Sequence, residues 1–284
     1  MKRVNEIIKE QKEMIKGNTF NFGFIELNSY LSYVKENGVI TLFGYPAMGK
    51  TSFVLNIVNN ISKYHKTSIL YITTEEREEF LTNVLLSVDS SIPLRKIQKG
   101  TIKNKEIEQF ENSIAVVSNY NLYIVEAFNK TSSNRTIEMS LREFFKEKDK
   151  DRKKIVIFDQ YYHDPDVIER VRRYTKKNNS MLFILAPFVS DTPICNELAL
   201  EDLDSYLRVI SDCILSIYKP SYFVSKIDDN SIYINVLKKN EKSNVGEIKF
   251  KFDTNTLKYD EEFLIDDLPF ELDLDFNEFD DIPF

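Results

Sequence analysis

One segment of the chain has residue types and spacing that point directly to phosphate chemistry. Residues 44–51 read GYPAMGKT, which is the G-x-x-x-x-G-K-T pattern of a phosphate-binding loop. The glycines permit a backbone path that turns N–H groups toward phosphate oxygens, and the following helix adds the positive end of its dipole. We expect an exposed loop lysine that reaches the outer phosphates and a threonine hydroxyl that binds Mg²⁺. The predicted ATP and Mg²⁺ site consists of Gly44, Gly49, Lys50, Thr51 and Ser52.

Hydrolysis of a bound nucleotide also requires carboxylates. The apolar segment 154–159 ends in Asp159, which has the position of a carboxylate that holds Mg²⁺. Glu75 follows the apolar segment 68–73 and is predicted to orient the attacking water. Each assignment has an open alternative. In place of a Mg²⁺ ligand, Asp159 would be only a turn residue at a strand end. In place of a catalytic residue, Glu75 would belong to a solvated acidic run that continues to Glu79.

The elements around these residues predict an α/β fold. An apolar strand at 39–43 precedes the loop, and a helix with an apolar face follows from 50 to about 63. Further apolar strands are predicted at 68–73, 121–126, 154–159, 181–186 and 213–218. Such alternation is typical of a mainly parallel sheet with helices on both faces. After Pro220, we predict an antiparallel pair at the sheet edge, 231–238 and 246–253, joined by a polar loop.

Charge divides the chain unequally. Residues 260–284 hold eleven acidic and no basic side chains, and residues 1–259 hold 38 basic and 34 acidic ones, a net charge of +4. We predict an amphipathic N-terminal helix within 1–17, an ATPase domain at 18–259 and a disordered acidic tail at 260–284.

Composition excludes several other classes of protein. The longest apolar run, MLFILAPF at 181–188, is shorter than the ~18 residues of a membrane span, and the N-terminal residues lack a signal-peptide pattern. Two cysteines, Cys195 and Cys213, are too few for a disulfide framework or a zinc site, so we expect buried thiols. A cytoplasmic protein that does not cross a membrane is expected.

These motifs together resemble the motor domain of DnaB-type replicative helicases. The loop PAMGKTSF resembles the family's P-S-M-G-K-T-x-F, and GFIELNSYL at 23–31 resembles its G-F-x-x-L-D segment, with Asn28 in place of Asp. TTEE at 73–76 lies where the family has S-L-E-M, and RKIQKGTI at 95–102 resembles K-I-x-x-G-x-L. The resemblance extends from about residue 17 to 259.

The resemblance implies a RecA-like P-loop ATPase that acts on single-stranded DNA. It implies that Glu75 is the catalytic glutamate and Asp159 the Walker B aspartate. It also implies a homo-oligomer, with a hexameric ring as the family form, in which the helix within 1–17 resembles the linker helix that docks on an adjacent subunit.

Three departures from the family pattern bear on activity. Pro187 stands where the family has a glutamine that senses the terminal phosphate. The region that touches DNA in the family has no Lys or Arg here between Lys177 and Arg208; it contains Asp191, Glu197, Glu201, Asp202 and Asp204. In the family's K-x-R-x-G segment, Lys239 matches the lysine, Glu241 replaces the arginine that reaches the neighbouring nucleotide, and Lys242 is a candidate substitute. Losing such an arginine can cost about 10³ in turnover.

The C-terminal residues resemble the acidic tip of bacterial single-stranded DNA-binding proteins. That tip ends in D-D-[IL]-P-F and recruits replication and repair enzymes; a second copy lies upstream. The terminal phenylalanine can fill an apolar pocket, its α-carboxylate can meet a cation, and the aspartates can face a basic rim. Alternatives are a generic acidic solubility tail and a segment that adds a strand. The candidate partner-binding residues are Asp266, Asp267, Leu268, Pro269, Phe270, Asp280, Asp281, Ile282, Pro283 and Phe284.

Three functions fit these features. The first is an ATP-hydrolysing, helicase-related motor of DNA replication or recombination that recruits partners by its tail. The second is an adaptor with weakened catalysis, in which ATP controls assembly and the tail recruits proteins. The third is a RecA-like strand-annealing or mediator protein.

Overall fold

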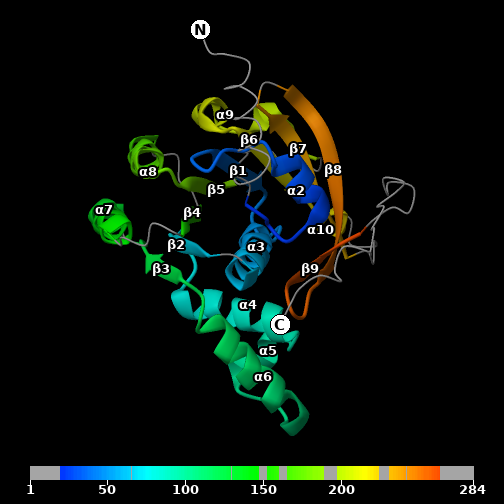
Figure 1. The fold of residues 1–284 in the computed structure, drawn as a ribbon. Helices are drawn as coiled ribbons and strands as arrows, with labels where there is room; N and C mark the ends of the chain where they lie inside the picture. Colours follow the sequence, from blue (N-terminus) through cyan, green and yellow to red (C-terminus); the bar gives the residue numbers. More distant parts are fainter. Residues whose placement is uncertain are drawn as a thin grey trace, which may run out of the picture.

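A nine-stranded sheet forms the centre of the computed structural model (Figure 1). The structure describes residues 20–64, 66–128, 130–146, 152–159, 165–188, 197–223, 230–240 and 242–262. The strand order is β3-β2-β4-β5-β1-β6-β7-β8-β9. Pairs between the first six strands are parallel, and the pairs β6–β7, β7–β8 and β8–β9 are antiparallel. The predicted mainly parallel sheet with antiparallel strands at one edge is confirmed.

Of the nine described strands, the six parallel ones lie close to the predicted ranges because each is a largely apolar run. Their bounds are β1 Val39–Gly44, β2 Thr67–Thr73, β3 Leu122–Glu126, β4 Lys153–Asp159, β5 Met181–Pro187, β6 Cys213–Tyr218, β7 Ser231–Lys239, β8 Lys242–Asp253 and β9 Lys258–Glu261. β1 and β2 are buried along their whole length, as expected for strands covered on both faces.

Helices cover both faces of the sheet. Their bounds are α2 Ile25–Leu31, α3 Lys50–Tyr64, α4 Glu78–Ser90, α5 Leu94–Lys99, α6 Asn104–Val117, α7 Lys130–Lys146, α8 Pro165–Lys177, α9 Ser205–Ile210 and α10 Pro220–Phe223, with a 3₁₀ turn at Leu200–Asp202. Side chains of α2, α3 and α4 pack in one core cluster, and those of α7, α8 and α9 in another on the opposite face. α5 and α6 lie beyond α4 (Figure 1).

The antiparallel edge differs in two ways from the sequence-based prediction. The polar loop between β7 and β8 is shorter, because Lys239 pairs with Lys242 and Asn240 adopts a left-handed φ of 53° in the turn. A further strand, β9, pairs with β8 and forms the sheet edge. It was missed because its four residues, KYDE, carry no apolar alternation beyond Tyr259.

β9 ties the C-terminal part of the described fold to its beginning. The carboxylate of Glu261 accepts hydrogen bonds from the backbone N–H groups of Ile25, Glu26 and Leu27 at 2.6, 2.8 and 3.2 Å. These N–H groups open α2 and have no partner within the helix, so the carboxylate caps it. The fold therefore continues past the predicted domain end at residue 259.

Three predicted features lie outside the described residues: the helix within 1–17, nearly all of the acidic tail, and Cys195. Cys213 is described and buried, as expected. Within the described residues, no helix has the length and apolar character needed to cross a membrane.

Candidate functional site

The phosphate-binding loop connects β1 to α3 at the carboxyl end of the parallel strands. Its backbone is left-handed at Ala47 and at Gly49, where φ is 61° and 95°. A Cβ atom at Gly44 would lie 2.5 Å from the Ile217 side chain, so β6 packs directly against the first glycine. The glycine requirement inferred from the pattern thus has two causes here: backbone conformation at Gly49 and close packing at Gly44.

Lys50 is the first residue of α3, and the structure corrects the expectation that it is exposed. Its side chain is only 4% exposed, and its Nζ donates hydrogen bonds to the carbonyl oxygens of Gly44 and Tyr45 at 3.0 and 2.9 Å. Burial lowers the pKa of Lys50 to about 8, against the opposing charges of Asp159 and Glu75. The ammonium group therefore lies inside the loop, where a phosphate would be a stronger partner than two neutral carbonyl groups.

Asp159 lies beside Thr51, although 108 positions separate them in sequence. The Thr51 hydroxyl donates a 2.9 Å hydrogen bond to Oδ2 of Asp159, which is 1% exposed. Burial raises the pKa of Asp159 to about 6, while hydrogen bonds from Tyr71 and Thr51 and the charge of Lys50 lower it. The Thr51 hydroxyl at the start of α3 and the Asp159 carboxylate at the end of β4 are oxygen ligands of the kind that Mg²⁺ prefers, so these residues fit the ion.

Tyr71 is a site residue that the sequence analysis missed. Its hydroxyl, on β2, donates a 2.5 Å hydrogen bond to the same Oδ2 of Asp159. The tyrosine is fully buried, and burial followed by the Asp159 charge raises its pKa well above 10, so it remains a donor. The sequence holds one weak signal: a tyrosine hydroxyl within the apolar run SILYIT, two residues before the strand ends.

Glu75 and Glu76 follow β2 in a tight turn. The Thr73 hydroxyl accepts from the backbone N–H of Glu76 and donates to its carbonyl oxygen, both at 2.9 Å. Thr73 also pairs in register with Asp159, which places this turn beside the Mg²⁺ donor set. Burial and the charge of Glu75 raise the pKa of Glu76. Glu75 itself is exposed, so both the catalytic and the solvated interpretation stay open.

Pro187, the residue at the predicted phosphate-sensor position, pairs in register with Gly44 at the start of the loop. The next residue, Phe188, donates its backbone N–H to the Gly44 carbonyl at 2.9 Å and packs edge-on against the ring of Tyr45, with centroids 5.0 Å apart. The proline side chain offers no hydrogen-bonding atom at this place. The side chain of residue 187 therefore cannot donate a hydrogen bond to a phosphate.

β9 supports the loop from the other side. The Tyr259 hydroxyl donates to the Gly49 carbonyl at 3.1 Å. The Asn56 side chain on α3 accepts from the Tyr259 backbone N–H at 3.1 Å and donates to the Leu257 carbonyl at 2.8 Å. These bonds join the loop and its helix to the sheet edge, and sequence patterns gave no sign of them.

The two lysines predicted to act in catalysis do not lie near this loop. Lys239 pairs with Cys213 at the start of β6, and Cys213 pairs with Ile40 near the start of β1. This is the amino end of the strands, whereas the loop is at the carboxyl end. The Lys239 ammonium lies 4.9 Å from the ring centre of Tyr33. The side chain of Lys242 lies outside the described residues, as do Glu241 and the ten candidate residues of the tail.

Two of the acidic residues expected in the DNA-facing region have local roles. Asp204 accepts from the backbone N–H groups of Tyr206 and Leu207 and caps α9. Asp202 accepts from the backbone N–H of Ala199 at 2.7 Å. Asp191 lies outside the described residues, and Glu197 lines a separate pocket that is described below.

Comparison with known proteins identifies relatives of the chain. The model of the DnaB-like helicase C terminal domain matches residues 20–178, more than half of the chain. A probable replicative DNA helicase of Trieres chinensis is 24% identical over 270 residues, which cover 88% of this chain and 58% of that protein. A replicative DNA helicase DnaB of Nostoc sp. is 28% identical over 109 residues, which cover 38% of this chain and 12% of the Nostoc protein. The chain thus spans little more than half of the first relative and less of the second.

Solved structures share the fold. A solved ATPase domain superposes with a TM-score of 0.78 at 19% identity, covering 93% of this chain and 100% of that domain. A DnaB-like replicative helicase superposes with a TM-score of 0.75 at 18% identity; its structure was solved in a study of its interactions with primase. The superposition covers 91% of this chain and 66% of the helicase chain. The RecA-like fold predicted from the sequence is therefore confirmed.

Proposed function

The chain belongs to the DnaB-like helicase C-terminal domain family, and on this premise we propose that it is an ATP-hydrolysing motor of DNA replication or recombination that acts on single-stranded DNA. The observation that carries the proposal is the convergence of Thr51 and Asp159 beside a loop that holds a buried lysine. Lys50 and Thr51 begin α3 directly after β1, and Asp159 ends β4, so only the folded sheet brings the carboxylate beside the other two.

Each residue of this group has a definite task in the proposal. Backbone N–H groups of the loop bind phosphate oxygens, and Lys50 exchanges its carbonyl partners for the outer phosphates. Thr51 and Asp159 hold Mg²⁺, which would neutralise charge on the phosphates when bound. Glu75 orients the attacking water and accepts its proton.

The proposal includes a ring of identical subunits, in which Lys239 acts at the nucleotide of a neighbouring copy. This lysine lies at the opposite end of β1 from its own loop, so it can reach a terminal phosphate only on a neighbouring copy. We assign the same role to Lys242 if Lys239 proves dispensable. The helix within 1–17 would then dock on the adjacent subunit.

The proposal is tested by ATP turnover and by mass. ATP hydrolysis should be measured with and without single-stranded DNA, and the mass of the protein with and without ATP and Mg²⁺. A motor requires hydrolysis that single-stranded DNA stimulates, and a ring requires a mass equal to that of several subunits. Nucleotide binding without any hydrolysis under either condition would reject the motor.

A second candidate is an ATP-controlled adaptor, and Pro187 favours it. The proline beside Gly44 removes a side-chain contact to the terminal phosphate, which would slow hydrolysis without preventing binding. In this case ATP would control assembly, and the D-D-[IL]-P-F segments of the tail would recruit proteins that dock on single-stranded DNA-binding proteins. Assembly that depends on ATP but not on its hydrolysis would distinguish the adaptor from the motor.

A further inference from the structure

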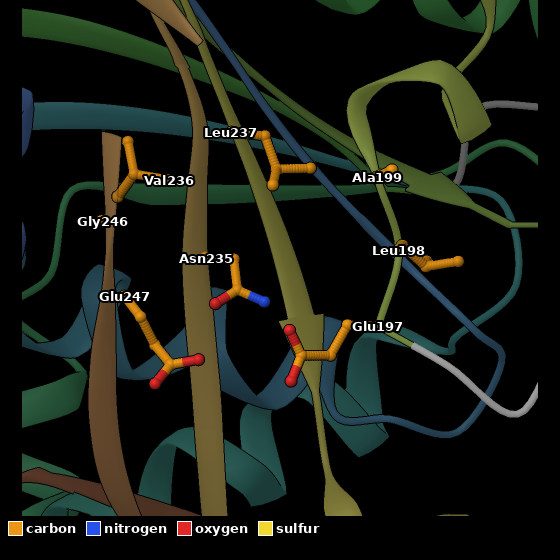
Figure 2. A pocket seen from close by; sticks show the side chains of 8 residues that line it. All are labelled: Glu197, Leu198, Ala199, Asn235, Val236, Leu237, Gly246 and Glu247. Carbon is orange, nitrogen blue, oxygen red and sulfur yellow. The ribbon is translucent and has the colours of Figure 1, made fainter. Parts of the chain in front are cut away.

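A pocket of about 450 Å³ lies on the β7–β8 face of the sheet (Figure 2). β7 and β8 form its floor, and the segment 197–199, which precedes the 3₁₀ turn, forms a wall. Its polar residues are Glu197, Asn235 and Glu247. No part of the proposed ATPase chemistry uses them.

Asn235 is the buried polar group of this pocket. Its side chain is 92% buried, and Figure 2 shows its amide directed between the carboxylates of Glu197 and Glu247. Within the described part of the chain, the amide makes no hydrogen bond. Because the amide lines the pocket, a ligand that enters can supply the hydrogen-bond partner that the described residues do not provide.

Asn235 also lies in a row of polar groups across the strands. It pairs in register with Ser216 on β6 and with Glu247 on β8. The Ser216 hydroxyl is buried and has no hydrogen-bond partner in the described structure. Residues paired in this way share one face of a sheet, so the polar row interrupts an otherwise apolar surface that includes Leu237.

Glu197 and Glu247 are both exposed acidic side chains that line the pocket. Neither forms an ion pair with any described residue, and the nearby Lys249 is bound to Glu262 at 2.7 Å. Burial and the charge of Glu197 raise the pKa of Glu247, so the two carboxylates repel each other when both are ionised. A cation between them would relieve this repulsion and could also accept the Asn235 oxygen as a ligand.

We propose that this pocket binds an arginine side chain of a protein partner. A guanidinium group has five N–H donors in a planar fork, which suits two carboxylates and an amide oxygen, and its aliphatic stem can pack on Leu198 and Leu237. A volume of about 450 Å³ exceeds that of a single ion. No described cluster of three His, Cys, Asp or Glu residues has the geometry of a metal site. Charge and size therefore favour the arginine over a metal.

The test uses the full chain and a labelled peptide, acetyl-Gly-Gly-Arg-Gly-Gly-amide. A matched peptide carries citrulline, which has nearly the same shape but no charge. The parent protein should bind the arginine peptide about tenfold more tightly than the citrulline peptide, because a charge-assisted pair is roughly twice as strong as a neutral one. The double variant Glu197→Gln/Glu247→Gln should lose that preference and keep ATP binding.

A charge-matched control separates this pocket from the acidic surface in general. Glu108→Gln/Glu111→Gln removes the same charge from exposed positions on α6 and should keep the preference. Asn235→Leu should weaken binding of the arginine peptide without lowering the thermal midpoint, because the amide has no hydrogen-bond partner among the described residues to lose. Equal binding of both peptides by the parent, or equal loss in the pocket and control variants, would overturn the proposal.

Titration with Mg²⁺ or Ca²⁺ that blocks the peptide at the parent alone would assign the pocket to a metal. A change in oligomeric mass in the pocket variant alone would assign it to a neighbouring copy.

Discussion

Tyr71→Phe isolates one oxygen atom in the proposed Mg²⁺ site. The substitution keeps the buried ring and removes the 2.5 Å hydrogen bond to Asp159. A hydrogen bond to a charged group contributes about 1.5–3 kcal/mol, and one pKa unit corresponds to about 1.4 kcal/mol. The pKa of Asp159, about 6 in the parent, should therefore rise by about one unit or more in the variant.

The sign of the pH dependence follows from the direction of that shift. Because the folded-state pKa of Asp159 is raised from its usual 3.8, ionisation destabilises the fold: stability falls as pH rises from about 4 to about 6 and stays lower above this window. In Tyr71→Phe the fall continues to a higher pH. The free-energy difference between parent and variant should be about 1.5–3 kcal/mol at pH 8 and smaller at pH 5, where Asp159 is protonated.

Two measurements check this prediction. Urea unfolding at pH 5 and pH 8 gives the stability differences, and fluorescence of a labelled ATP analogue gives the pH midpoint of Mg²⁺-dependent binding. That midpoint should move upward in the variant, because Mg²⁺ needs the ionised carboxylate. Tyr206→Phe is the matched control, since it removes a 2.7 Å hydroxyl bond to Glu169 away from the loop. The same stability difference at both pH values, with an unchanged binding midpoint, would refute the assigned role of Tyr71.

Three further predictions concern the loop, the glutamates and the tail. Lys50→Met should weaken binding of MgATP by about tenfold or more, which calorimetric titration measures. The thermal unfolding midpoint should stay unchanged or rise, because the substitution removes a buried charge. Glu75→Gln should bind nucleotide and lose most hydrolysis. Comparison with Glu76→Gln in a phosphate-release assay shows which glutamate acts. Equal activity of both variants and the parent would exclude a catalytic glutamate in this turn. Deletion of Phe284 should weaken the affinity for replication and repair proteins by a few kcal/mol, without changing ATP binding. The variant should therefore recover less of these proteins from bacterial lysate than the full chain. A chain that ends at Glu262 keeps β9 intact and serves as the control without a tail. If this shortened chain recovers as much of these proteins as the full chain, recruitment by the tail is excluded.

Local patterns were sufficient for the six parallel strands and for the phosphate-binding loop. The loop is eight consecutive residues, and each parallel strand is an apolar run whose length and flanking residues mark it without knowledge of its neighbours. The position of Asp159 at the end of such a run was also predictable, because carboxyl ends of parallel strands meet at one edge of the sheet. The roles predicted for Glu75, Lys239, Lys242 and the tail stay predictions.

What the sequence determined by itself, then, is the kind of site and the class of fold, because glycine spacing, charge and apolar runs act over a few residues. Tertiary structure decided which distant groups share an atom or a surface. Tyr71 reaches Asp159 only because β2 pairs with β4, and Glu261 caps α2 only because β9 adds to the sheet edge. The pocket around Asn235 likewise depends on the register of three strands. Strand order and register result from packing of the whole core, and no local pattern in the chain contains that information.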